Sequence, residues 1–70
     1  MTYSIYFPDT DTFVIDLAVL SEDLGDDVFA WGESPDAEDA TLLDTEQKAH
    51  KYAAQISERT NRETFVCINF

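Results

Sequence analysis

The chain has 70 residues and a formal net charge of −11 at pH 7, with 44% hydrophobic and 13% aromatic side chains. A chain of this length forms one domain, residues 1–70, and its apolar content is that of a folded protein rather than of a disordered acidic tail. The charge argues against direct binding to nucleic acid and against binding to anionic membranes, because both would repel the protein.

The charges are unevenly distributed along the chain. Thirteen of the fifteen acidic residues lie between Asp9 and Glu46, a stretch without any Lys or Arg. All basic residues follow in the last third, at Lys48, Lys51, Arg59 and Arg62. A concentrated negative field attracts cationic molecules and accelerates their association. The asymmetry therefore predicts a basic partner protein.

The cysteine content and the first residues bear on localisation. Cys67, the single cysteine, cannot form a disulfide within the chain, which favours a reducing compartment. Residues 1–7 carry no basic side chain, and their apolar run ends at Pro8, unlike a signal peptide or a membrane span. We expect a cytoplasmic protein.

The first 24 residues predict a strand, a turn and an ambiguous segment. Thr2–Phe7 alternates as a strand does, and Pro8–Asp11 has the composition of a tight turn. In Thr12–Leu24, a strand would place on one face Phe13, Ile15, Leu17 and Val19, whereas a helix capped by Asp11 would align Phe13, Leu17, Leu20 and Leu24. The β-branched residues favour the strand. A third possibility is a strand to Val19 followed by one helical turn over Ser21–Leu24.

The middle of the chain predicts short extended pieces. Val28–Trp31 is apolar and bounded by acids and a glycine, as a short strand would be. Gly32–Ala40 combines acids with a proline and small residues, which is the composition of a solvated loop. Thr41–Leu43 is a candidate edge strand.

The last third predicts a helix and a final strand. Asp44 followed by Gln47 resembles a capping box. The apolar stripe that should face a sheet comprises Ala49, Tyr52, Ala53 and Ile56. Glu63–Phe70 is apolar on both faces, as a central strand would be. Together these elements predict an α+β fold, with a small antiparallel sheet of three to five strands, one main helix packed on one face, and the order β-β-β-α-β.

Few residue patterns point to catalysis. Cys67 and His50 could form a nucleophilic pair, but a cysteine in the middle of an apolar strand is typically a small buried hydrophobe. The two glycines cannot build a phosphate-binding loop, and one cysteine with one histidine cannot complete a zinc site. We therefore expect no enzymatic activity and no cofactor.

Carboxylates suited to calcium or magnesium occur at two places, Asp9 with Asp11, and Asp36 with Glu38 and Asp39. A calcium-binding loop beginning at Asp36 would have Thr41 where a glycine is needed and Gln47 where the final glutamate is needed. We therefore expect no specific metal site.

The acidic segment predicts a mimic of nucleic acid. Carboxylates fixed on a folded surface can pair with the Lys and Arg side chains of a DNA- or RNA-handling protein or ribonucleoprotein and exclude its ligand. The candidate partner-binding residues lie in predicted turns and loops: Asp9, Asp11, Glu22, Asp23, Asp26, Asp27, Glu33, Asp36, Glu38 and Asp39. Asp16 is a weaker candidate. Tyr6 or Trp31 would anchor such an interface if exposed beside the acids, although core packing is favoured for Trp31.

By its size and charge alone, such a mimic would belong with phage-type anti-CRISPR and anti-restriction proteins or with inhibitors of repair enzymes or nucleases. The alternative is a non-enzymatic acidic domain adapted to high salt, with an unrelated protein-binding role. That alternative predicts acids on every exposed face, yet four of the six charged residues between Lys48 and Glu63 are cations.

Overall fold

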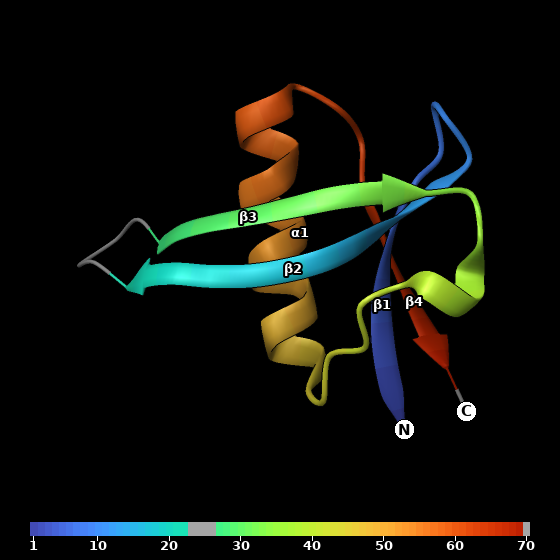
Figure 1. Ribbon diagram of the computed structural model, residues 1–70, viewed down its shortest axis with the longest axis horizontal. Coiled ribbons are helices and arrows are strands. Elements are labelled where there is room, and N and C mark those ends of the chain that lie inside the picture. Colours follow the sequence, from blue (N-terminus) through green and yellow to red (C-terminus); the bar gives the residue numbers. More distant parts are fainter. Residues whose placement is uncertain (23–26, 70) are drawn as a thin grey trace.

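The computed structural model describes residues 1–22 and 27–69. These residues form a four-stranded antiparallel sheet, a short 3-10 helix η1 and a longer helix α1 (Figure 1). Along the chain the elements are β1 (Thr2–Phe7), β2 (Thr12–Glu22), β3 (Asp27–Ser34), η1 (Ala37–Asp39), α1 (Glu46–Thr60) and β4 (Phe65–Asn69). The strands lie in the order β3-β2-β1-β4. The predicted α+β fold and its element order are confirmed.

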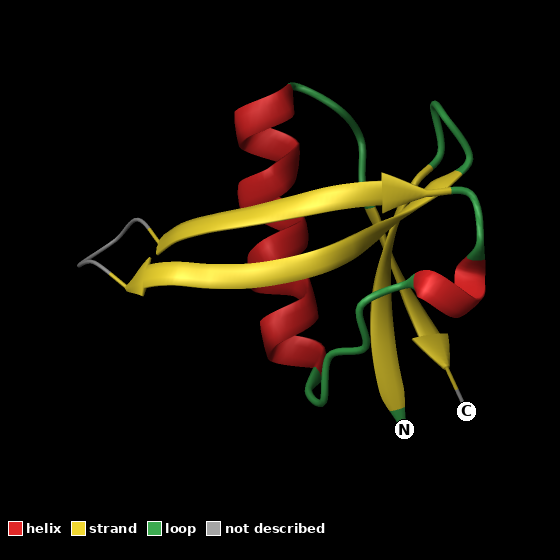
Figure 2. Ribbon diagram, in the orientation of Figure 1, coloured by secondary structure: helices red, strands yellow, loops and turns green. Residues whose placement is uncertain are grey.

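The sheet is bent into two ribbons that cross (Figure 2). β2 and β3 form one ribbon, which passes across α1, and β1 and β4 form the other. β1 and β2 pair only beside their turn, at Tyr6↔Phe13 and Phe7↔Thr12, and then diverge. The chain just before α1 passes between them, because Leu43 exchanges two backbone hydrogen bonds with Tyr3, of 2.9 and 2.7 Å.

Segment 41–43 is therefore not the edge strand that its sequence predicts. It makes a single bridge, between Leu43 and Tyr3. On its other side the Thr41 N–H donates to the Val14 carbonyl of β2 at 2.9 Å. The segment satisfies backbone groups that the divergence of β1 and β2 would otherwise leave unpaired.

β2 is a strand over its whole described length, which confirms the favoured interpretation of Thr12–Leu24 as far as Glu22. Asp23 and Leu24 lie outside the described residues. The alternative of a helical turn beginning at Ser21 is wrong, because Ser21 and Glu22 pair with β3.

The predicted apolar face of β2 is also wrong, because a bulge interrupts the alternation. Asp16 has a φ of 51°, and between Ile15 and Ala18 the strand holds one residue more than β3 opposite it. Aspartate tolerates this left-handed backbone better than most residues. As a result Val14 is buried and Leu17 packs against the same core, while Phe13 lies on the other face of the sheet.

β3 and β4 differ in extent from their predictions. β3 continues beyond Trp31 to Ser34, and η1 follows, so Gly32–Ala40 is not one irregular loop. β4 begins at Phe65 and lies at the edge of the sheet rather than in its centre. Apolar residues on both faces suggested a central strand, but Phe65 and Ile68 are each about half exposed.

α1 begins one residue later than the Asp44 capping pattern implies. Thr45 is the N-cap, and its hydroxyl accepts a hydrogen bond from the Lys48 N–H at 3.2 Å. Asp44 instead pairs with the Lys48 ammonium at 3.3 Å on the surface. The helix ends at Asn61, whose left-handed φ of 55° is a common C-terminal cap conformation.

We expect Thr45→Ala to lower the free energy of unfolding by about 1 kcal/mol, because the first turn of α1 loses its cap. Asp44→Ala is the matched control and should change it by less than about 0.5 kcal/mol, as surface pairs contribute little. Urea denaturation of the two variants measures both values. Equal losses would show that Asp44 shares the capping role.

The core lies between α1 and the sheet. The predicted helix stripe is confirmed, since its buried residues are Ala49, Tyr52, Ala53 and Ile56. The strands contribute buried residues at Ile5, Phe7, Val14 and Phe29. Phe29 contacts Tyr52 edge-on with ring centroids 5.2 Å apart, and Trp31 packs beside Phe29 at 5.4 Å. Trp31 thus serves the core, as favoured.

Candidate protein-binding surface

Six of the ten predicted carboxylates gather where the β1–β2 turn, the end of β3 and η1 meet. We call this set the acidic turn cluster: Asp9, Asp11, Glu33, Asp36, Glu38 and Asp39. The turn supplies the first two, β3 supplies Glu33, and η1 with its cap supplies the others. The β2–β3 pairing at Phe13↔Ser34 brings these segments to one end of the sheet.

Arg62 joins two parts of the acidic turn cluster. Its Nε donates to Asp9 Oδ2 at 2.9 Å and its Nη2 to Asp9 Oδ1 at 3.0 Å. The same Nη2 donates to Glu33 Oε1 at 2.9 Å and to Thr10 Oγ1 at 2.9 Å. The guanidinium also lies over the Phe7 ring, 3.9 Å from its centroid. Sequence reasoning missed this role of Arg62.

The pairing perturbs the titration of all three charged groups. The hydrogen bonds from Arg62 hold the pKa of Asp9 and that of Glu33 below their ordinary values. Thr12 contributes at Glu33, donating its hydroxyl to Oε1 at 3.0 Å. Glu33 and Asp9 together raise the pKa of Arg62. Both carboxylates are therefore ionised and fixed in position at neutral pH.

The carboxylates of η1 are also held by local hydrogen bonds. The Asp36 Oδ1 accepts from the Glu38 N–H at 3.0 Å, which makes Asp36 the N-cap of η1. Ser34 Oγ donates to Asp39 Oδ2 at 3.3 Å and accepts from the Asp36 N–H at 3.1 Å. These bonds fix Asp36 and Asp39 relative to the end of β3.

A side chain of the sheet, Tyr6 of β1, holds Asp11 in position. The Tyr6 hydroxyl donates to Asp11 Oδ1 at 2.5 Å, and this bond raises the pKa of Tyr6 above its ordinary value. Asp11 itself has a left-handed φ of 55° at the end of the turn. Five of the six cluster carboxylates thus accept hydrogen bonds from neighbouring groups.

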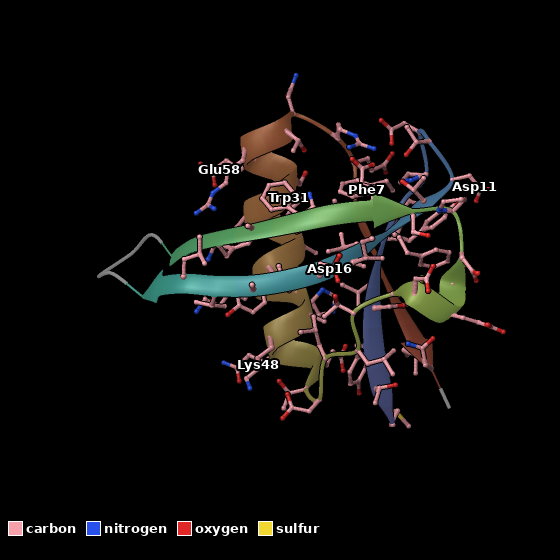
Figure 3. All side chains as sticks on the ribbon, viewed as in Figure 1. Phe7, Asp11, Asp16, Trp31, Lys48 and Glu58 are labelled. Atoms are coloured by element: carbon pink, nitrogen blue, oxygen red, sulfur yellow. The ribbon has the colours of Figure 1, made fainter. Side chains whose placement is uncertain are left out.

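The cluster has a strong local charge. Its six carboxylates and the single Arg62 guanidinium leave a formal charge of −5 at this end of the molecule. The other basic residues are on α1 (Lys48, Lys51 and Arg59). Figure 3 shows Asp11 on the side of the molecule away from Lys48 and Glu58. The asymmetry of the sequence is therefore also an asymmetry in space.

The other candidates within the described residues lie elsewhere. Glu22 and Asp27 lie opposite each other at the far end of the β2–β3 ribbon, about 20 Å from Glu33 at the usual rise of a strand. Asp23 and Asp26 lie outside the described residues. Asp16 is exposed at the β2 bulge. The ten predicted residues therefore do not form one surface.

Other chemistry is weakly represented among the described residues. Within 1–22 and 27–69, no group of three or more His, Cys, Asp or Glu side chains is arranged to hold a metal ion. Cys67 is partly buried on β4, whereas His50 is exposed on α1 and lies 3.4 Å from Glu46 Oε1. In the same part of the chain, no helix is both long and apolar enough to cross a membrane.

A groove of about 450 Å³ opens between β2, the chain before α1, and α1 itself. Its lining is polar and apolar in equal parts: Leu17, Val19, Leu42 and Leu43 provide apolar surface, and the Asp44–Lys48 ion pair provides polar surface. The groove offers apolar contact area without an array of groups for acid–base chemistry.

Comparison with models of protein families, with curated proteins and with solved structures gave no match.

Proposed function

We propose that this protein is a non-enzymatic inhibitor that mimics nucleic acid and occupies the basic groove of a DNA- or RNA-handling protein. The acidic turn cluster is the surface that enters the groove. Its partner is a basic nucleic-acid-binding protein or ribonucleoprotein of the same cytoplasm, in the manner of anti-CRISPR, anti-restriction or nuclease-inhibiting proteins of phage type.

The observation that carries this proposal is the hydrogen-bond network that fixes the carboxylates. Phosphates in a nucleic acid are held at set positions by the backbone, and a mimic needs its anions equally fixed. In the cluster, Arg62 positions Asp9 and Glu33, while Ser34 positions Asp39. Fixed carboxylates lose little conformational entropy when they pair with cations of a partner.

Arg62 does not neutralise the negative charge that the acidic turn cluster presents to solvent. The Arg62 side chain is only 22% exposed, whereas the Asp9 side chain is 49% exposed and that of Glu33 36% exposed. Arg62 therefore holds the two carboxylates from their buried side, and the carboxylates face solvent. Such an arrangement keeps the negative field outside, where it accelerates encounter with a basic groove and is screened by salt.

The experiment compares two triple variants of equal charge. The cluster variant carries Asp36→Asn, Glu38→Gln and Asp39→Asn. The helix variant carries Asp44→Asn, Glu46→Gln and Glu58→Gln. Each removes three negative charges, from −11 to −8, and each keeps side-chain shape, so that Asn can still cap η1.

Immobilised wild-type protein and both variants are exposed to bacterial lysate, eluted with duplex DNA, and the eluates are identified by mass spectrometry. We expect a nucleic-acid-binding protein from the wild type and the helix variant, reduced at least tenfold with the cluster variant, since three charge-assisted contacts are lost. Equal loss with both variants would show that net charge alone attracts the protein.

The high-salt alternative makes a different prediction. It requires the melting temperature to climb steadily into molar KCl, whereas simple screening of self-repulsion saturates below about 0.5 M. If the melting temperature climbs steadily into molar KCl and no partner elutes with DNA, the proposal of an inhibitor is wrong. The protein is then an acidic domain adapted to high salt.

A further inference from the structure

Three aromatic side chains form a row across the outer face of the sheet. Tyr6 of β1 lies directly opposite Phe13 of β2 and directly opposite Phe65 of β4. Residues opposite one another in an antiparallel pair project on the same face. Ser34 of β3 lies opposite Phe13 and completes the row across all four strands. We call Phe65, Tyr6 and Phe13 the aromatic row.

The row is on the face away from α1. The neighbours of these residues along each strand, Phe7, Val14 and Val66, belong to or pack against the core under α1. The aromatic row therefore does not serve that core. Phe65 is 49% exposed, Tyr6 and Phe13 are partly exposed, and the Tyr6 and Phe13 rings contact at 5.1 Å between centroids.

The row ends in the acidic turn cluster. Asp11 accepts the hydrogen bond of the Tyr6 hydroxyl. At the β3 end of the row, Ser34 donates to the Asp39 carboxylate and accepts from the Asp36 backbone N–H. Partly exposed aromatic faces and fixed carboxylates are thus adjacent on one surface.

This combination suits an arginine side chain. A guanidinium is planar and weakly hydrated on its faces, so it stacks on an aromatic ring while its edge donates to carboxylates. The protein already contains one such arrangement, since Arg62 lies over Phe7 at 3.9 Å and binds Asp9 and Glu33 through its edge. A lysine ammonium is a compact, strongly hydrated charge and gains less from a ring.

Aromatic residues on a sheet also stack the bases of single-stranded nucleic acid. Those platforms are flanked by cations that bind phosphates. Here the flanking groups are carboxylates, which repel phosphates. The charge complementarity therefore favours a cationic protein side chain as the occupant.

Resting on the function proposed above, we infer that the aromatic row anchors an arginine of the partner protein, whose guanidinium stacks on Phe65 and Tyr6 and donates to Asp11. The partner is then distinguished from other basic proteins by exposed arginine rather than by positive charge alone.

The test compares two labelled peptides of equal length and charge, five Gly-Arg repeats and five Gly-Lys repeats, by fluorescence anisotropy at about 150 mM NaCl, where screening limits non-specific attraction. We expect wild-type protein to bind the arginine peptide about three- to fivefold more tightly, the range of an exposed cation–ring contact.

Two variants assign the preference to the row. Phe65→Leu keeps apolar area but removes the ring face, and should bring the ratio of the two dissociation constants close to 1. Ile68→Leu is the control, because Ile68 is equally exposed on the same strand but on its other face. It should leave the ratio unchanged, and circular dichroism confirms that both variants fold.

A spectroscopic readout accompanies the affinities. Ring currents should shift the arginine δ-methylene protons upfield on binding to wild-type protein, and Phe65→Leu should reduce that shift. Equal affinity for the two peptides, with both weakened in the cluster variant, would overturn the arginine anchor and leave the mimicry intact. Peptide binding that the cluster variant does not weaken would overturn the mimicry itself.

Discussion

Replacing Phe7 by alanine is expected to remove roughly half of the free energy of unfolding. The Phe7 side chain is fully buried, between the core and the Arg62 guanidinium. Truncation of a buried phenylalanine costs about 3–5 kcal/mol, while a domain of this size has a total stability of roughly 4–10 kcal/mol. The urea midpoint, followed by Trp31 fluorescence, should fall by roughly half.

Phe65→Ala provides the matched control, since it makes the same substitution at a half-exposed site of the same sheet. It should lower the free energy of unfolding by only roughly 1–2 kcal/mol, because about half of Phe65 is already in water. Comparable losses at the two positions would contradict the description of β4 as an open edge.

Replacing Arg62 by methionine is expected to lower the melting temperature at pH 7 by roughly 4–8 °C, the shift that one strong charged contact gives in a domain of this size. Methionine preserves an apolar contact with Phe7 but leaves Asp9 and Glu33 close together without their cation. Lys48→Met is the control. It also removes one positive charge, but the Lys48 ammonium pairs with Asp44 on the surface, and such a pair contributes little to stability.

The effect of Arg62→Met should depend on pH in a defined direction. In the wild type the pKa values of Asp9 and Glu33 are lowered, so their stabilisation is present above the unfolded-state pKa near 4 and is lost as pH falls through the folded-state values. The difference in melting temperature between wild type and Arg62→Met should therefore shrink below about pH 4. A constant difference from pH 7 to pH 2 would show that Arg62 acts through packing on Phe7 alone.

Local patterns were sufficient to predict α1 and the class of the fold. The stripe from Ala49 to Ile56 repeats at helical spacing, and burial of that stripe against a sheet follows from its composition. The N-cap was misplaced by one residue because Asp44 and Thr45 are both good caps. The choice between them depends on the direction in which the chain leaves Leu43, and that is set by pairing with Tyr3.

The shape of the sheet was not predictable in the same way. The bulge at Asp16 depends on Thr41, whose hydroxyl accepts from the Leu17 N–H at 3.2 Å and which is far along the chain. The edge position of β4 depends on which strand β1 pairs with on each side. Strand alternation carries no information about either.

The candidate surface was predicted in part. The turn and η1 acids were chosen for their loop-like composition, and six of them do lie together. The proximity of the turn acids to those of β3 and η1 depends on the register between β2 and β3, which brings Glu33 beside Thr12. The role of Arg62 could not be inferred from spacing, because it is separated from Asp9 by 53 positions.

The separation between Arg62 and its carboxylates has a consequence for the nascent chain. During synthesis the residues from Asp9 to Glu46 leave the ribosome with thirteen carboxylates and no cation among them. β1 can find β4 only after residue 69 has been made, since Thr2 pairs with Asn69. The anionic segment therefore lacks its Arg62 partner until residue 62 has been made, and it lacks the strand that completes the sheet until residue 69 has been made. Mutual repulsion keeps such a segment extended and soluble, so the charge that shapes the finished surface also protects the unfinished chain from aggregation.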